Sequence, residues 1–139
     1  MKIYLDNAAT TPMDPEVVDA MIPVMKNQFG NPSSIHSWGR EVKTAIENAR
    51  KNVAKCLNVA PAEIFFTSGG TEANNTAIFC SVRDLGVKHA ITSRIEHHAV
   101  LHTLEELEKE GKIKLSFVNL TDKGHIDLKH LEELLQGSK

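Results

Sequence analysis

The feature that most limits the fold is a regular alternation of strand and helix patterns in the second half of the chain. Short apolar segments are each followed by a pattern of helical periodicity. The expected strands cover residues 63–68, 88–93 and 113–120, and the expected helices cover residues 71–85, 97–110 and 127–136. This order is typical of an α/β protein in which helices cover a mostly parallel sheet.

Two helical patterns precede the alternation. Residues 14–29 place apolar side chains at helical spacing behind Asp14, a favourable N-cap, and Pro23 inside this pattern should kink the helix. Residues 35–57 carry one continuous apolar stripe, which predicts a longer helix. Turn-forming residues at 30–34 separate the two helices.

Length and composition restrict the class of protein. With 139 residues, 41% of them hydrophobic, the chain suits one packed globular domain. Residues 1–60 are expected to form an arm with helices, and residues 61–139 the first, incomplete part of an α/β domain. A net charge of −2 without charged blocks predicts no nucleic-acid or membrane partner. Cys56 and Cys80 are predicted to be buried, inert thiols without a cationic neighbour, and a cytoplasmic setting is expected.

A glycine pair joins the first expected strand to its helix. In residues 66–75 (FTSGGTEANN), Gly69 and Gly70 let the backbone approach a ligand, and the helix start offers unpaired N–H groups. Thr71 adds a hydroxyl group. This arrangement can form a cup for a phosphate group, and a plain strand-to-helix connection capped by Thr71 is the alternative. It matches neither the Walker loop nor the dinucleotide-binding fingerprint.

Histidines mark the start of the next expected helix. His97 follows the carboxyl end of a strand, the edge at which open α/β sheets bind ligands. In the first turn of a helix the dipole disfavours imidazolium, so a neutral His97 could stack on a heteroaromatic cofactor and exchange protons. A metal site at His98 and His102 is a weaker alternative, because the ligand pattern is loose, and we expect no metal. An ordinary exposed helix start is the third reading.

Taken together, these motifs resemble those of the cysteine desulfurases of class-V aminotransferase type. The matching segments are residues 4–12 (YLDNAATTP), 29–34 (FGNPSS) with His36, 66–75 (FTSGGTEANN) and 92–100 (TSRIEHHAV). The resemblance covers essentially the whole chain. It implies an α/β fold that is part of the large pyridoxal-phosphate-binding domain of a fold type I enzyme, with an N-terminal helical segment.

The resemblance also implies roles for individual residues. Gly70 and Thr71 would bind the phosphate group of pyridoxal 5'-phosphate through backbone N–H groups and the threonine hydroxyl. His97 would stack on the pyridine ring and move protons to and from the substrate. Residues 10–11 and 31–36 would lie near the substrate side of the cleft or the dimer contact.

The implied reaction converts L-cysteine to L-alanine and passes the sulfur to an enzyme cysteine as a persulfide. A homodimer would deliver this sulfur to a scaffold protein for iron–sulfur cluster or thio-cofactor assembly. The family's Schiff-base lysine and persulfide cysteine have no matching position here, so we expect an N-terminal portion that is inactive alone. One alternative is that the complete protein is a selenocysteine lyase or some other class-V enzyme. The other is a non-catalytic interaction fragment that uses residues 35–57.

The family fold makes a further prediction about the strands. It separates the segment equivalent to residues 63–68 from the other two strands by strands that would come from later sequence. Residues 63–68 should therefore not pair with the other two strands within this chain. Open strand edges invite association, so we expect the isolated chain to be unstable or prone to aggregation.

Overall fold

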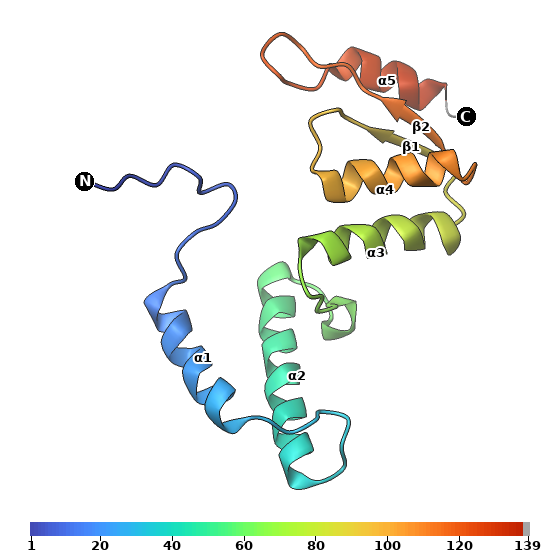
Figure 1. The fold of residues 1–139 in the computed structure, drawn as a ribbon. Coiled ribbons are helices and arrows are strands. Elements are labelled where there is room, and N and C mark those ends of the chain that lie inside the picture. The colour runs from blue at the N-terminus through green and yellow to red at the C-terminus, as the bar shows by residue number, and fades with distance from the viewer. Residues whose placement is uncertain (138–139) are drawn as a thin grey trace. The chain divides into compact units, whose positions relative to one another are not determined.

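The computed structural model describes residues 1–137, which fall into two units. The first unit is Met1–Phe65 and the second is Phe66–Lys139. Figure 1 shows helices alone in the first unit, and helices with two short strands in the second. Each unit is described by itself.

The first unit contains α1 (Pro15–Asn27), α2 (Ser37–Leu57) and the short 3-10 helix η1 (Pro61–Glu63). Asp14 caps α1 as predicted, because its side chain accepts the backbone N–H two residues further on. The helix continues past Pro23 to its end at Asn27. None of the residues of α1 is buried.

Close backbone contacts hold the loop between α1 and α2 against the start of α2. A Cβ atom on Gly30 would collide with the carbonyl group of Trp38, and one on Gly39 would collide with the Asn31 and Ser34 carbonyls. The ring of Phe29 stacks on that of Trp38, with 5.1 Å between the centroids. Glycine is therefore required at both positions by close approach of the backbone.

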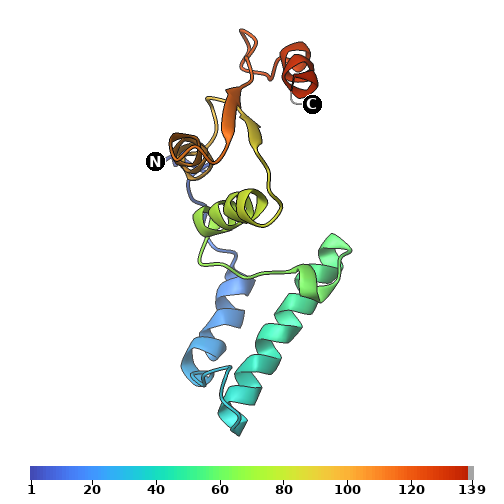
Figure 2. The ribbon, with the colours of Figure 1, turned by 90° about the vertical axis from the view of Figure 1, so that its right-hand side faces the viewer.

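The second unit contains α3 (Gly70–Arg83), β1 (His89–Thr92), α4 (His98–Lys109), β2 (Lys114–Phe117) and α5 (Leu128–Gln136). The two strands pair in parallel. Helix α3 packs on α4, and α4 packs on β2. Figures 1 and 2 show the strands between α4 and α5.

Side chains complete the pairing of the two strands. Ala90 lies opposite Leu115 in the register, and the ring of His89 hydrogen-bonds the hydroxyl of Ser116 across the strands at 2.8 Å. The carboxylate of Glu108 on α4 accepts the N–H of Leu115 at 2.8 Å. A side chain of α4 thus satisfies a backbone group of β2.

The hydrophobic core of the second unit joins α3, α4 and β2. Its buried members are Val82, Leu104, Leu107, Ile113 and Leu115, with Leu107 only 1% exposed. Such burial is the main source of stability for the unit. The α/β class expected from the sequence is confirmed.

The strand predicted at residues 63–68 is not formed. The 3-10 helix η1 includes Glu63, and the following residues up to Gly69 form neither a helix nor a strand of the sheet. The hydrophobic side chains of this segment are also exposed, 81% for Phe65 and 52% for Phe66. A strand requires a neighbour to pair with, and the sheet of residues 1–137 contains β1 and β2 alone, in agreement with the family topology.

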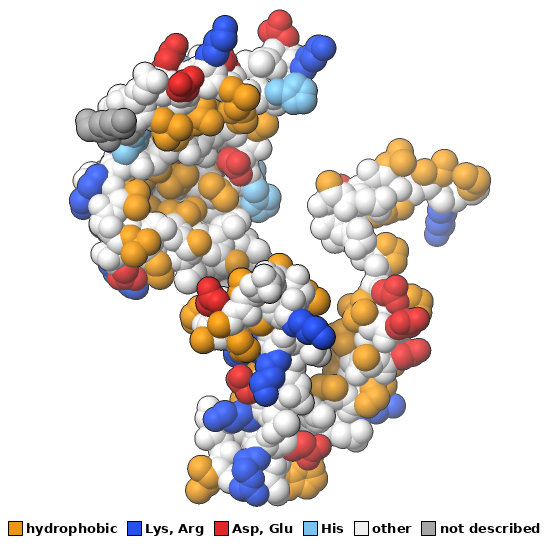
Figure 3. Space-filling view, turned by 180° about the vertical axis from the view of Figure 1, so that it is seen from behind, with side chains coloured by type: hydrophobic (Ala, Val, Ile, Leu, Met, Phe, Trp, Pro, Cys, Tyr) orange, Lys and Arg blue, Asp and Glu red, His pale blue; other side chains and the backbone are white. Residues whose placement is uncertain are grey.

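Hydrophobic side chains lie at the surface of both units, as Figure 3 shows. They include Val17 and Met21 of α1, Phe65, and Phe79 of α3. Surfaces of this kind are normally covered by other parts of a protein or by a partner. None of the described helices combines the length and the apolar character needed to span a membrane.

The N-terminal segment, expected to form an arm, contains a turn. The carbonyl of Asp6 accepts the N–H groups of Ala9 and Thr10 at 3.1 and 3.2 Å. The hydroxyl of Tyr4 also donates to this carbonyl and contacts the hydroxyl of Thr10. All of these residues are exposed.

Candidate functional site

The glycine turn opens α3 and leaves its first N–H groups accessible. Gly69 is the N-cap, and α3 begins at Gly70. The backbone of Gly69 is extended (φ 169°), a conformation that any residue adopts. Glycine is therefore useful at this position because it has no side chain. A Cβ atom on Gly69 or Gly70 would meet nothing within 4 Å, and both Gly70 and Thr71 are exposed. The N–H groups at the start of a helix have no acceptor within it.

Glu72 stabilises the approach to this turn. Its Oε2 atom accepts the N–H of Ser68 at 2.6 Å and the hydroxyl of Ser68 at 2.7 Å. These bonds, the backbone one first, hold the pKa of the Glu72 carboxyl below its usual value. An ionised Glu72 therefore fixes Ser68 beside the glycine pair while leaving the N–H groups of the helix start free of this carboxylate.

His97 is the N-cap of α4, one position before the first turn in which it was predicted. Its backbone is extended, and its Nδ1 atom accepts the N–H of Ala99 at 3.0 Å. The imidazole replaces the usual Ser or Asp at this position because its nitrogen can reach an unpaired N–H group. Accepting this bond requires a lone pair on Nδ1, so the neutral ring carries its proton on Nε2.

The adjacent histidines are arranged differently. The rings of His98 and His102 lie 4.8 Å apart on α4, whereas those of His97 and His98 are 6.1 Å apart and tilted by 57°. His98 thus approaches His102 along its own helix, and His97 caps the helix. Within residues 1–137, no group of three or more His, Cys, Asp or Glu residues is placed to hold a metal ion.

A side-chain hydrogen bond joins α3 to α4. The hydroxyl of Thr103 on α4 donates to the side-chain oxygen of Asn75 on α3 at 2.5 Å. The two helices lie side by side, and they begin at the same end in Figure 1. The structure therefore brings the starts of both helices, with Gly70, Thr71 and His97, into one unit. Residues 10–11 and 31–36, also singled out in the sequence, belong to the first unit.

Three further residues of this region were not predicted from the sequence. Glu72 lies four residues after Ser68, and this spacing could have been used to predict their contact. Asn75 and Thr103 are 28 residues apart and meet only because α3 packs on α4. No local pattern indicates such a pair.

A shallow groove follows α3 from the glycine turn to the end of the helix. Its lining residues are Ser68, Thr71, Glu72, Asn75, Thr76, Phe79, Cys80 and Arg83. Since all but Ser68 belong to α3, the groove is one exposed face of this helix. It begins at the candidate phosphate cup.

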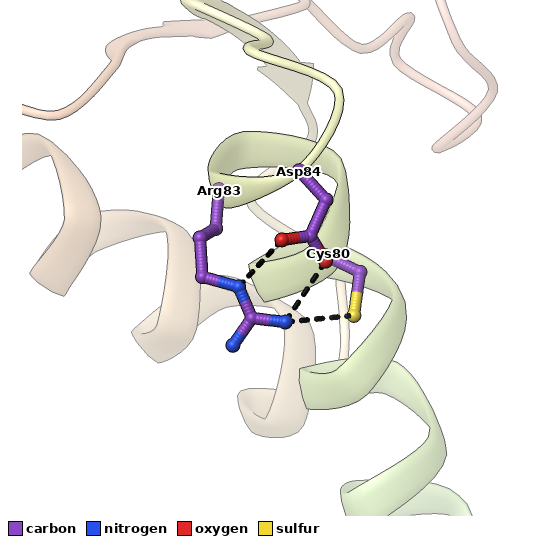
Figure 4. Close-up of polar contacts among 3 residues, drawn as sticks. All are labelled: Cys80, Arg83 and Asp84. Atoms are coloured by element: carbon purple, nitrogen blue, oxygen red, sulfur yellow. Dashed lines mark hydrogen bonds and ion pairs between the residues drawn. The ribbon is translucent and has the colours of Figure 1, made fainter.

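A charged cluster closes the groove, and it corrects the prediction for the cysteines (Figure 4). Arg83 binds the carboxylate of Asp84 through two nitrogens at 2.7 and 2.8 Å, and its guanidinium lies 3.9 Å from the Cys80 sulfur. This pairing raises the pKa of Arg83 and lowers that of Asp84. Cys80 therefore has a cationic neighbour and is only partly buried, and Cys56 is exposed. Apolar residues next to each cysteine in the sequence suggested that the thiols are buried, but no other part of residues 1–137 covers these helix faces fully.

The glycine turn suits a phosphate group on physical grounds. The space beside Gly69 and Gly70 is open, and the first-turn N–H groups and the Thr71 hydroxyl are at the surface. The positive end of the α3 dipole favours an anion at this position. The residues present therefore fit the phosphate of pyridoxal phosphate.

Comparison with known proteins identifies the family. The family described as Aminotransferase class-V matches residues 3–139. The chain is 48% identical over 137 residues to the cysteine desulfurase IscS of Dictyoglomus turgidum, with 97% of this chain and 34% of the relative covered. It is 47% identical over 137 residues to the mitochondrial cysteine desulfurase of Saccharomyces cerevisiae, with 96% and 27% covered.

Solved structures give the same result for the fold. A NifS-like protein superposes with a TM-score of 0.87 at 40% identity, covering 96% of this chain and 37% of that protein. SspA in complex with cysteine superposes with a TM-score of 0.78 at 36% identity, covering 91% and 37%. The chain thus spans about a third of the length of the relatives that it matches.

Class-V aminotransferases and NifS-like cysteine desulfurases are pyridoxal-phosphate-dependent enzymes. The match extends over nearly the whole chain, and the fold agrees with the solved relatives across both units. The glycine turn of α3 and the histidine cap of α4 lie within the matched residues. This chain belongs to the class-V aminotransferase family.

Proposed function

We propose that this chain is the N-terminal portion of a pyridoxal-phosphate-dependent cysteine desulfurase. The complete enzyme would convert L-cysteine to L-alanine and transfer the sulfur to an enzyme cysteine for iron–sulfur cluster or thio-cofactor assembly. The observation that carries the proposal is the pairing of an open glycine turn with a histidine cap at the starts of two adjacent helices. The similarity to cysteine desulfurases over 97% of the chain supports it.

Gly70 and Thr71 would hold the cofactor phosphate. The backbone N–H groups at residues 70–72 would donate to phosphate oxygens, and the Thr71 hydroxyl would add one more donor. Glu72 would keep the turn in shape through Ser68, because its carboxylate is already engaged by two hydrogen bonds. When bound, pyridoxal phosphate supplies an electron sink for the bonds made and broken at the substrate carbon.

His97 would stack on the cofactor ring and help to move protons to and from the substrate. With Nδ1 engaged by the Ala99 N–H, the neutral imidazole presents the Nε2 proton to the substrate side. Taking up a second proton at Nδ1 would break the cap and place a cation at the positive end of α4. The cap therefore leaves the Nε2–H group as the hydrogen-bond donor that the neutral ring can direct to the substrate.

The proposal includes the partners expected of the complete enzyme. It would work as a cytoplasmic homodimer, take L-cysteine as its substrate, and hand sulfur to a scaffold protein. The Schiff-base lysine and the persulfide cysteine would come from sequence beyond the matched third. Hydrophobic residues at the surface of both units support a requirement for further covering structure.

The test uses a chimeric enzyme, termed the joined enzyme, in which this chain replaces the matched N-terminal part of the Dictyoglomus turgidum relative. The joined enzyme should bind pyridoxal phosphate and form alanine and sulfide from L-cysteine. L-selenocysteine is assayed in parallel, and a preference for it would favour the lyase alternative. A folded joined enzyme that binds the cofactor and releases no alanine from either substrate would refute the proposal.

A further inference from the structure

A chain of contacts runs from α3 to the histidine cap of α4. It begins with the hydrogen bond between Thr103 and Asn75, whose oxygens lie 2.5 Å apart. Both residues are partly buried, and the apolar residues Val100 and Leu104 flank Thr103 on its own helix. A polar contact in such surroundings is stronger than one in water. The bond therefore ties the middle of α4 to the first half of α3.

The chain of contacts continues along α4 through Ala99. The Thr103 hydroxyl lies 2.9 Å from the carbonyl oxygen of Ala99, one helical turn earlier. Ala99 is buried, and its own N–H donates to Nδ1 of His97 at 3.0 Å. The single hydroxyl proton of Thr103 is shared between the oxygens of Asn75 and Ala99, so Thr103 contacts Ala99 on its carbonyl side. On its N–H side Ala99 donates to His97.

We infer that Asn75 and Thr103 are positioning residues for His97, because they fix Ala99, whose N–H keeps the proton of the neutral imidazole on Nε2. The catalytic part of this inference rests on the proposed function. The structural part concerns only which ring nitrogen of His97 carries the proton.

The geometry explains why two residues outside the site would have this effect. A neutral imidazole carries one N–H, and the hydrogen bond made by one nitrogen decides where that proton lies. If Ala99 shifts, Nδ1 loses its donor and the two tautomers become similar in energy. Asn75 also follows Thr71 by four residues, so both lie on one face of α3. The same tie thereby relates the position of His97 to that of the phosphate cup.

The test uses the joined enzyme with paired variants. Thr103→Val removes the hydroxyl and keeps the branched shape, and Thr103→Ser keeps the hydroxyl. The matched control is Thr44→Val, because the Thr44 hydroxyl makes the same bond to a carbonyl one turn earlier, that of Arg40, at 2.8 Å on α2. The readouts are kcat and KM for L-cysteine, and the ring ¹⁵N signals of His97 in the enzyme without cofactor. A His97→Gln variant assigns these signals.

Loss of the Thr103 hydroxyl and its hydrogen bonds should lower kcat and allow both tautomers of the His97 ring to be populated. Thr103→Val should reduce kcat about 3- to 10-fold, the range for one neutral hydrogen bond, with KM nearly unchanged. Its His97 signals should show both tautomers, whereas the wild type, Thr103→Ser and Thr44→Val should show the proton on Nε2. A Thr103→Val enzyme with wild-type kcat and a single tautomer would overturn the inference.

Variants of Asn75 test the same link from the other helix. Asn75→Leu removes the bond to α3 but leaves the Thr103 hydroxyl its bond to Ala99, so its effect on kcat and on the tautomers should lie between those of the wild type and Thr103→Val. Asn75→Asp, which keeps an oxygen acceptor, should resemble the wild type. The double variant Asn75→Leu/Thr103→Val should be no worse than Thr103→Val alone, because Thr103→Val already removes the bond to Asn75. Fully additive losses would contradict a shared role.

Two remaining outcomes are also decisive. If Thr103→Val does not fold, the comparison of Asn75→Leu with Asn75→Asp decides the inference by the same criteria. If the joined enzyme shows no activity on L-cysteine, the proposed function fails. The His97 tautomer then still decides the positioning role, because it is measured without substrate or cofactor.

Discussion

The carboxylate of Glu72 accepts both the N–H and the hydroxyl of Ser68, at 2.6 and 2.7 Å, across the glycine turn that opens α3. The two residues enclose Gly69, Gly70 and Thr71 between them. A carboxylate beside a phosphate cup would ordinarily repel the anion. Here it is directed to Ser68, so it shapes the turn without occupying the N–H groups that a phosphate would need.

This relationship predicts a pH-dependent turn. The pKa of Glu72 is lowered from 4.5, so ionised Glu72 stabilises the turn fully above pH 4.5, and this contribution is lost as the pH falls through the lowered value. In the joined enzyme, hydrogen exchange at the Ser68 amide should be slower in the wild type than in Glu72→Gln. The difference should vanish at acid pH. Equal exchange rates in the two proteins above pH 4.5 would contradict the prediction.

Thr71 should contribute directly to cofactor affinity. Thr71→Val keeps the shape of the side chain and removes the hydroxyl, so one hydrogen bond to a charged phosphate is lost. The Kd for pyridoxal phosphate should rise about 10- to 100-fold, as expected for such a bond. Fluorescence titration of the joined enzyme measures this change, and Thr44→Val serves as the control. An unchanged Kd in Thr71→Val would remove Thr71 from the phosphate cup.

The order of helices and strands in the second unit could be predicted from the sequence because it depends on local signals. Asp127 caps α5 as an acidic N-cap should, and the apolar segments around β1 and β2 form the expected parallel pair. The strand prediction for residues 63–68 was wrong because an apolar run becomes a strand only beside a neighbouring strand. Local pattern shows the apolar run and not its neighbour.

The site was predictable to a similar degree. Gly70, Thr71 and His97 stand in recognisable motifs, and both helices begin within one residue of the expected positions. The cap formed by His97 was missed by one position because a histidine rarely takes the place of Ser or Asp there. The contact of Asn75 with Thr103 depends on helix packing, which no spacing along the chain encodes.

The core of the second unit should be sensitive to cavities. Leu107 is 1% exposed and belongs to the cluster that joins α3, α4 and β2. Leu107→Ala should lower the free energy of unfolding of the joined enzyme by about 2–5 kcal/mol. The exposed Glu105 on the same helix supplies the control, since Glu105→Ala should cost no more than about 0.5 kcal/mol. Urea denaturation compares the two, and equal losses would contradict the core assignment.

The isolated chain should be a poor enzyme and a poorly behaved protein. Within residues 1–137 its sheet has two strands, and Phe65 and Phe79 are among the many hydrophobic residues at its surface. Residues 1–139 alone should therefore aggregate, bind pyridoxal phosphate without a covalent link, and release no sulfide from L-cysteine. Light scattering, absorbance and sulfide assays test these points. A stable monomer that desulfurates L-cysteine unaided would contradict the proposed division of the enzyme.

The central claim is that this chain contributes His97 as the proton-transfer residue of a cysteine desulfurase. It is tested most directly by the kcat of the joined enzyme for alanine formation from L-cysteine, in the wild type and in His97→Ala and His98→Ala. His97→Ala should lower kcat about 10²- to 10⁴-fold, the usual contribution of acid–base catalysis. His98→Ala should stay within about 3-fold, as expected for a residue that only approaches His102. Similar losses in the two variants, or a wild-type kcat in His97→Ala, would contradict the account.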